Sequence, residues 1–296
     1  MAVVTVVGSA NVDQVFRVER IPSPGETVLA QSTSIARGGK GQNQVVAAAR
    51  AGATTMFIAC VGSDAFGQIT VTGLKEDGVD AARIRRTATA TGTAMIAVEG
   101  GGENTIIVSP GANGELADLT SEDIDAIEAS AVLLMQLEIP IETVLAASKV
   151  ARAGSTITIL NAAPIRDVPL ELLELIDILI VNEHEAASIA NGRDLPDLAR
   201  VVPLVIVTLG ARGAIAYRAD AREVHVGAPR VVAVDATGAG DTFCGALAAA
   251  LAEGLDTKAA LEFAVVAASL SVESHGAVPS IPRRGAILEA MARAGD

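Results

Sequence analysis

The fold is decided by residues 234–247, which read Val-Asp-Ala-Thr-Gly-Ala-Gly-Asp-Thr-Phe-Cys-Gly-Ala-Leu. The preceding residues 230–234 are a short β-branched run, which predicts a strand. Residues 242–251 are small and apolar and contain no proline, which predicts a buried helix. The turn Gly238-Ala239-Gly240 therefore leads into a helix N-terminus, where free backbone N–H groups and the helix dipole attract anions.

Asp241 follows this turn directly, so it stands in the first turn of the predicted helix. A carboxylate beside an anion site is unexpected in a pure binding site, because two negative groups repel each other. The pair makes sense if a hydroxyl lies between them, since the carboxylate can take its proton while the turn holds phosphoryl oxygens. The alternative is a glycine-rich turn whose Asp only helps the helix to start.

Composition limits the class of protein. The chain has 296 residues, which suggests one large or two modest domains. Half of the residues are hydrophobic but only 2% are aromatic, so the core must be built from Ala, Val, Leu and Ile. The net charge is 22 − 35 = −13 and no basic run stands out, which argues against nucleic acid and anionic membranes as partners.

Cys60 and Cys244 are the only cysteines and form no Cys-x-x-Cys pair, which argues against a zinc site or a disulfide framework. Free cysteines favour a reducing, cytoplasmic location. Residues 1–7 are apolar but lack a basic start, so we expect a first strand rather than a signal peptide. No apolar run has the length of a membrane span.

The order of predicted elements indicates an α/β fold. From residue 132 to residue 208 predicted strands alternate with predicted helices, which is typical of parallel βαβ units and a mostly parallel central sheet. Residues 14–36 have β-leaning residues around a Pro-Ser-Pro-Gly turn and no helix, so we expect a small β lid inserted there. The main domain would then comprise residues 1–13 and 37–296, and the strands predicted near residues 93–108 are candidates for the same lid.

A second polar constellation lies near the N-terminus, and comprises Asn11, Asp13, Gly39, Lys40 and Asn43. Asn and Asp supply donors and acceptors for vicinal hydroxyls, Lys a cation, and glycine a close backbone approach, which suits a sugar or polyol. The alternative is ordinary turn chemistry at a strand end, with Asn43 as a helix cap.

Three further junctions leave their role open. Glu138 ends a predicted strand and either binds a hydroxyl or faces solvent. Asn182 and Glu185 begin a helix, and either compensate its dipole or hold metal-bound waters near phosphates. Residues 208–213 are either a plain hairpin or a contact for a nucleotide.

In order and spacing these stretches together resemble the PfkB carbohydrate kinases over nearly the whole chain, and most closely the members that phosphorylate ribose. The matching features are Asn11-Val12-Asp13, Gly38-Gly39-Lys40-Gly41-Gln42-Asn43-Gln44, Gln136-Leu137-Glu138, Asn182-x-x-Glu185, Thr208-Leu209-Gly210-x-Arg212-Gly213 and residues 235–241. The resemblance implies a three-layer α/β/α fold with a mostly parallel central sheet and a small β-sheet lid.

The resemblance also implies roles for these residues. Asp241 would be the base that deprotonates the sugar hydroxyl, and the amides of Gly238, Ala239 and Gly240 would form an anion hole. The residues expected to hold the sugar are Asn11, Asp13, Gly39, Lys40, Gly41, Gln42, Asn43 and Glu138. Those expected to contact ATP are Asn182, Thr208, Leu209, Gly210, Ala211, Arg212, Gly213 and Gly240.

The family likeness further implies cations and a partner. Glu185 would lie near Mg²⁺ and bind it through water. A loop for a monovalent cation, K⁺, would use Asp235, Thr237, Ser271, Ser274, Gly276 and Ser280. The lid would also form the interface of a homodimer.

Several functions stay open at this stage. The leading hypothesis is ATP-dependent conversion of D-ribose to D-ribose 5-phosphate; fructose and deoxyribose are alternatives within the family. A nucleoside kinase is less favoured, because Tyr217 is the only Tyr and the lid offers only Phe16 to stack a base. A sugar-binding protein without activity is also less favoured, because mere binding does not require Asp241.

Overall fold

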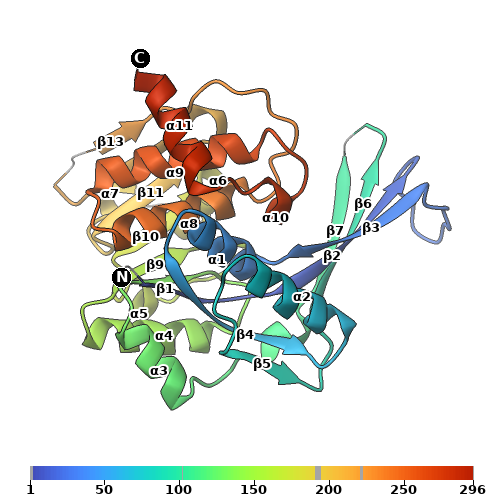
Figure 1. Ribbon diagram of the computed structural model, residues 1–296, viewed down its shortest axis with the longest axis horizontal. Helices are drawn as coiled ribbons and strands as arrows, with labels where there is room; N and C mark the ends of the chain where they lie inside the picture. Colours follow the sequence, from blue (N-terminus) through green and yellow to red (C-terminus); the bar gives the residue numbers. More distant parts are fainter. Residues whose placement is uncertain (1–2, 102, 191–194, 221–222, 296) are drawn as a thin grey trace.

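A nine-stranded sheet forms the centre of the molecule (Figure 1). The computed structural model describes residues 3–101, 103–190, 195–220 and 223–295. The strand order is β13-β12-β11-β10-β9-β8-β1-β4-β5; β12 pairs antiparallel with β11 and β13, and the other pairs are parallel. The strands are β1 (Val3–Val7), β4 (Thr54–Gly62), β5 (Ile84–Thr87), β8 (Val132–Met135), β9 (Ile157–Asn161), β10 (Ile178–Asn182), β11 (Leu204–Thr208), β12 (Ala214–Tyr217) and β13 (Glu223–Val226).

The order of the parallel strands reverses at β1. From β1 the chain builds outward through β4 and β5 on one side and through β8 to β11 on the other. Ligands of open α/β sheets bind beyond the carboxyl ends of the strands at such a reversal. The polar strand ends of the sequence therefore meet at this edge of the sheet.

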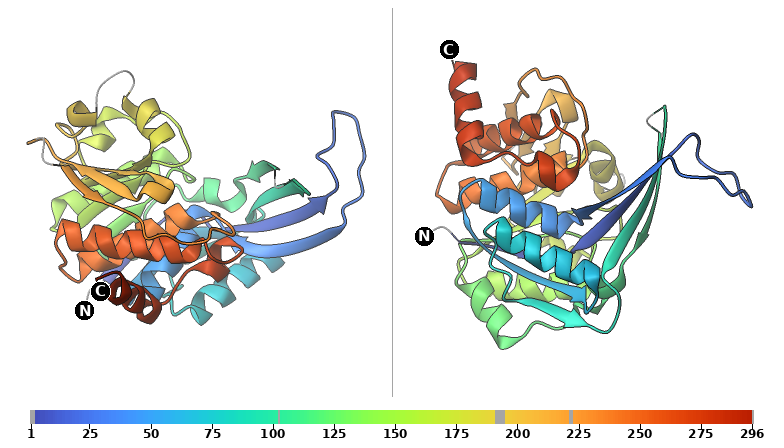
Figure 2. Two further views of the ribbon diagram at one scale, coloured as in Figure 1. Left: turned by 90° about the horizontal axis from the view of Figure 1, so that it is seen from above. Right: turned by 45° about the vertical axis from the view of Figure 1, so that its right-hand side comes forward.

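Helices cover both faces and produce the expected three layers, visible in the left view of Figure 2. Alternating strand residues show the division, since Val132 and Leu134 pack into one core and Leu133 and Met135 into the other. The first core contains α1 (Lys40–Arg50), α2 (Ala65–Glu76), α8 (Ala239–Ala252), α9 (Thr257–Ser271), α10 (Ala277–Ser280) and α11 (Arg284–Gly295). The second contains α3 (Ser121–Glu128), α4 (Ile141–Ala153), α5 (Leu170–Leu173), α6 (Glu183–Ala190) and α7 (Leu195–Leu198).

A smaller sheet of four strands extends away from this body (Figures 1 and 2). Its order is β3-β2-β6-β7, with bounds β2 (Asn11–Val18), β3 (Ser32–Gly38), β6 (Gly92–Glu99) and β7 (Asn104–Ser109). Residues 14–36 supply most of β2 and β3, and β6 and β7 complete the sheet. Because only residues 8–10 separate β1 from β2, the base of this sheet lies at the carboxyl end of β1. The division into a main domain and a lid stays a prediction.

One local prediction is wrong, and one alternative is excluded. Residues 230–234 form no strand; Val232 and Val234 are exposed, and the β-branched side chains do not pack into the sheet. Helix α1 begins at Lys40 and is preceded by Gly39 at φ 89°, so Asn43 lies inside the helix and is not its cap. A positive φ is costly for any residue with a Cβ, which explains the glycine there.

Candidate active site

Residues 234–247 place Asp241 at the carboxyl edge of the sheet. Helix α8 begins at Ala239, one residue after Gly238, which has φ 76°. A Cβ on Gly238 would lie 2.9 Å from the Cβ of Ala277, so both space and backbone conformation require glycine. Among the residues that the structure describes, none accepts a hydrogen bond from the N–H of Gly238 or Gly240. The N–H of Ala239 donates to the carbonyl of Ala236 at 3.2 Å.

The carboxylate of Asp241 is buried and held by two amides from α1. Asn43 Nδ2 donates to Asp241 Oδ2 at 2.9 Å, and Gln44 Nε2 donates to Asp241 Oδ1 at 2.9 Å. A buried carboxylate needs such donors, because its desolvation is otherwise uncompensated. The side-chain oxygen of Asn43, Oδ1, is buried and has no partner in the described structure. It is an acceptor available to a hydroxyl.

Lys40 brings a positive charge among three carboxylates. The negative charge of Asp241, opposed by burial and assisted by Glu138 and Glu185, raises the pKa of Lys40 above its usual value. Lys40, Glu185 and Asp241 line a polar cavity of about 240 Å³. The other lining residues are Asn161, Ala163, Ile180, Val181, Asn182, Thr208, Ala236, Gly238, Gly240 and Cys244.

Of the residues expected to bind the sugar, Lys40 lines this cavity and the others are not among its lining residues. They lie at the start of β2, around the start of α1 and just after β8. Glu138 Oε2 accepts from the Ser9 hydroxyl at 2.5 Å and from the Lys40 backbone N–H at 2.9 Å. Asn11 Oδ1 accepts from Asn113 Nδ2 at 2.6 Å.

Gly41 and Gln42 instead fit tightly into the backbone around them. A Cβ on Gly41 would lie 2.5 Å from the backbone nitrogen of Ser9. Gln42 Nε2 donates to the carbonyl of Gly38 at 2.6 Å.

Asn182 and Glu185 form a reciprocal pair at the start of α6. The Asn182 N–H donates to Glu185 Oε2 and the Glu185 N–H donates to Asn182 Oδ1, both at 2.8 Å. This is a capping-box arrangement, which satisfies two free donors of the helix terminus. Both residues also line the polar cavity, so the cap fixes Glu185 at its wall.

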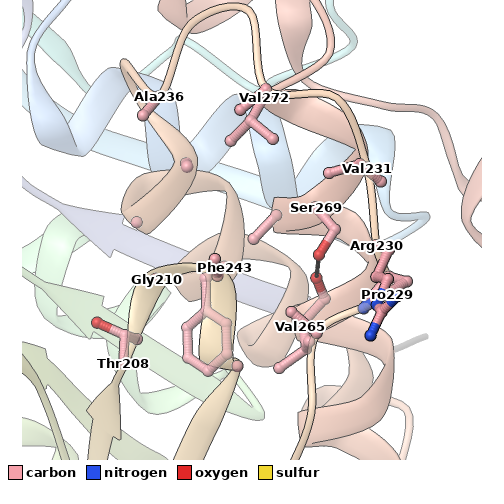
Figure 3. Close-up of a pocket in the computed structure, with 17 residues that line it drawn as sticks. Thr208, Gly210, Pro229, Arg230, Val231, Ala236, Phe243, Val265, Ser269 and Val272 are labelled. Atoms are coloured by element: carbon pink, nitrogen blue, oxygen red, sulfur yellow. Dashed lines mark hydrogen bonds between the residues drawn. The ribbon is translucent and has the colours of Figure 1, made fainter.

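A second cavity of about 660 Å³ lies on the other side of the α8 N-terminus (Figure 3). Apolar side chains dominate its lining, among them Phe243, Val265 and Val272. The remaining lining residues are Thr208, Gly210, Ala211, Gly213, Ala228, Pro229, Arg230, Val231, Ala233, Ala236, Ala239, Gly240, Ala268 and Ser269. Thr208, Ala236 and Gly240 line both cavities, so the two meet beside Asp241.

Some of the residues predicted to contact the nucleotide line the large cavity, and others do not. Thr208, Gly210, Ala211 and Gly213 line the large cavity. Leu209 is not among its lining residues, and the exposed guanidinium of Arg212 pairs with Glu183 at 2.6 Å.

The two segments predicted to hold a monovalent cation are in contact. Asp235 Oδ2 accepts from the N–H of Gly276 at 2.8 Å, and Asp235 Oδ1 accepts from the N–H of Thr237 at 2.9 Å. Of the three serines predicted to take part, Ser271 and Ser280 are buried, whereas Ser274 is exposed. Within the described part of the chain, no three His, Cys, Asp or Glu side chains are placed to share a metal ion. A cation here would therefore be held largely by carbonyl and hydroxyl oxygens.

The structure adds residues that the sequence did not single out. Asn161 ends β9 and lines the polar cavity, and a polar residue directly after the predicted strand 156–160 is a signal that could have found it. Asn113 lies in a short 3₁₀ turn, where no periodic pattern marks it. Phe243 belongs to a helix face whose apolar pattern predicts only core packing.

Asp13 is partly buried among these charges. Burial, together with the negative charges of Glu138 and Asp241, raises the pKa of Asp13 from its usual 3.8 to about 6. The folded, ligand-free protein therefore resists ionising this side chain. The stability that this shift contributes is present at low pH and is lost as the pH rises through about 6.

We expect Asp13→Asn to raise the free energy of unfolding of the ligand-free protein at pH 8 by on the order of 1–2 kcal/mol. The gain should shrink as the pH falls from about 6 towards 3.8, because Asp13 then takes up a proton in the folded state and no longer carries a partly buried charge. Urea unfolding at several pH values measures it, with the exposed Asp118→Asn as the control. A gain that grows on acidification would contradict the proposed charge repulsion.

No helix in the described ranges combines the length and the apolar character needed to cross a membrane. Residues 1–284 match the family model described as pfkB family carbohydrate kinase. A ribokinase of Haemophilus influenzae is 39% identical over 297 residues, covering 96% of this chain and 97% of its own. The structure of Arabidopsis thaliana ribokinase with ribose and ATP superposes with a TM-score of 0.92 at 32% identity, covering 98% of this chain and 99% of that one. The chain belongs to the pfkB family of carbohydrate kinases.

Proposed function

We propose that this chain transfers the terminal phosphoryl group of ATP to D-ribose and forms D-ribose 5-phosphate. The observation that carries the proposal is the meeting of the two cavities at the N-terminus of α8, with Asp241 beside their common wall. One cavity is large and apolar, which suits a nucleotide base and its ribose. The other is small and charged and is lined by Lys40, Asn182 and Glu185, which suits the phosphates and the hydroxyl that attacks them. The ribokinases similar over nearly the full chain support ATP and ribose as the two ligands.

The chemistry follows from this arrangement. The sugar hydroxyl attacks the γ-phosphorus while Asp241 accepts its proton, and the bond to the bridging oxygen of ADP breaks. The N–H groups of Gly238 and Gly240 and the helix dipole stabilise charge on the transferred oxygens. Asn11, Asp13, Lys40, Asn43 and Glu138 orient the sugar.

Binding of Mg²⁺ would involve Glu185. Its buried carboxylate lines the polar cavity, and only its Oε2 is engaged in the helix cap. A hard cation with water in its coordination shell accepts such an oxygen. The ion would supply charge neutralisation to the phosphates.

Binding of K⁺ at the loop of Asp235 would brace the anion site, because the same loop leads into Gly238. We expect turnover in potassium to exceed turnover in tetramethylammonium several-fold, since the bulky cation does not fit between the hydroxyl and carbonyl oxygens. A coupled ADP-release assay at constant ionic strength measures the ratio. Equal rates in both salts would rule out this cation site.

Removing the base is the direct test of the reaction. We expect Asp241→Asn to lower kcat by on the order of 10²–10⁴ while the dissociation constant of ribose changes little, as for loss of a positioned base. Steady-state kinetics and calorimetry measure the two quantities. Glu171→Gln, on the exposed surface of α5, is the control. Turnover of the Asp241 variant close to that of the wild type would refute the assignment.

The choice among sugars depends on the same assay with a panel of acceptors. Fructose, deoxyribose and nucleosides are the competitors. No aromatic side chain lines the polar cavity, which disfavours stacking of a nucleoside base there. Phosphorylation of a nucleoside in preference to ribose would overturn the ribose assignment.

We also propose that the four-stranded sheet is a lid that pairs with a second copy of the chain. Its register places Ile35, Met95 and Ile107 in one row across the strands, and each is about half exposed or more. Contiguous exposed apolar side chains of this kind mark interaction surfaces.

We further propose that the protein works in the cytoplasm. Cys60 and Cys244 are buried free thiols, which supports a reducing location.

We expect the double variant Met95→Lys, Ile107→Lys to lower the proportion of dimer, because two charges would be buried in the interface. Sedimentation velocity over a range of protein concentrations measures it. Leu288→Lys alters an equally exposed apolar side chain on α11 and serves as the control. An unchanged dimer in the double variant would contradict pairing through this row.

A further inference from the structure

We infer that Gln44 is a positioning residue for the base, and that it acts through a directed chain of buried side-chain amides. The inference rests on the proposed role of Asp241. Gln44 has no exposed surface and lines neither cavity, so its side chain is not open to the sugar or the nucleotide. Its effect reaches the reaction through the carboxylate alone.

The hydrogen bonds of Gln44 fix the orientation of its amide. Gln44 Oε1 accepts from Gln136 Nε2 at 2.7 Å. Gln44 Nε2 then donates both of its hydrogens, to Asp241 Oδ1 at 2.9 Å and to Asn161 Oδ1 at 3.0 Å. Because the oxygen faces a donor and the nitrogen faces two acceptors, a reversed amide would lose all three bonds. The chain therefore runs in one direction, from Gln136 through Gln44 to Asp241.

Burial and neighbouring groups hold this chain in place. Gln44 and Gln136 have no exposed surface, and Asn161 has 8%. Asn161 Nδ2 donates to the carbonyl of Ile180 at 3.3 Å, which sets the orientation of that amide as well. A Cβ on Gly8 would lie 2.0 Å from Gln136 Oε1, so the glycine makes the room in which Gln136 lies. Buried amides without partners would cost free energy, so these contacts must persist in the folded protein.

The carboxylate needs this restraint because of its positive neighbour. Asp241 is the main cause of the raised pKa of Lys40, so the two charges attract each other across the cavity. A carboxylate free to rotate would turn towards Lys40 and present less of its lone pairs to a sugar hydroxyl. Neutral amides on Oδ1 and Oδ2 prevent that rotation, and each oxygen keeps a second lone pair for the substrate.

Gln44→Met keeps the volume of the side chain and removes the amide. We expect kcat to fall by on the order of 10–10², since misplacement of a catalytic group is costly even at small displacement. The KM values for ribose and ATP should stay within about twofold, because uniform binding is not altered. Calorimetry with ribose checks that the binding site of the Gln44→Met variant is intact.

A double-mutant cycle with Gln136→Met separates positioning from stability. Gln136 contacts Gln44 and not Asp241, so its loss should lower kcat in the same direction but by less. If both act through one chain, the double variant should turn over at about the rate of Gln44→Met alone, a non-additive result. Thr70→Val, which alters a buried hydroxyl on α2 without a hydrogen bond in the described structure, should leave kcat unchanged.

The possible results distinguish a failure of the positioning role of Gln44 from a failure of the proposed function. Wild-type activity in the folded Gln44 variant, or losses that multiply in the double variant, would overturn the positioning role while Asp241→Asn still loses turnover. A higher KM with an unchanged kcat would also overturn it, because Gln44 would then contribute to substrate binding. A wild-type chain that phosphorylates no sugar would overturn the proposed function, and this inference with it.

Discussion

The site depends on a carboxylate that is buried next to a helix N-terminus and is compensated from three directions. Amides from α1 hold both oxygens of Asp241, Lys40 supplies the opposite charge, and the helix dipole of α8 supplies positive potential. A buried charge without such partners would destabilise the fold by several kcal/mol or would take up a proton. Binding chemistry and stability are therefore linked at one residue.

This compensation requires the topology of the large sheet. Helix α1 follows β3, in the part of the smaller sheet that comes directly after β1 in the chain. Helix α8 comes some 190 residues later, yet the two helices pack against each other. The packing is close because Gly245 has no side chain; a Cβ there would lie 2.3 Å from the carbonyl oxygen of Gln44. Small residues in α8 thus bring the amides of α1 within reach of Asp241.

The sequence alone predicted the alternating elements, the mostly parallel sheet and the turn that leads into α8, because these follow from local patterns and turn chemistry. It failed at residues 230–234, where β-branched residues face solvent at the rim of the large cavity, since propensity carries no information about the absence of a pairing partner. It also passed over Asn161 and Asn113, because a single Asn has no periodicity. Their roles arise from contacts with Gln44 and Asn11, which are about 100 residues away in each case.

A crystal structure with ribose and a non-hydrolysable ATP analogue tests the central claim most directly. The 5-hydroxyl of ribose should lie about 2.6–3.2 Å from an oxygen of Asp241, the reach required of a base. Oxygens of the terminal phosphate should lie about 2.7–3.1 Å from the amide nitrogens of Gly238 or Gly240. A carboxylate of Asp241 bonded only to protein, with sugar and phosphate bound elsewhere, would contradict the claim.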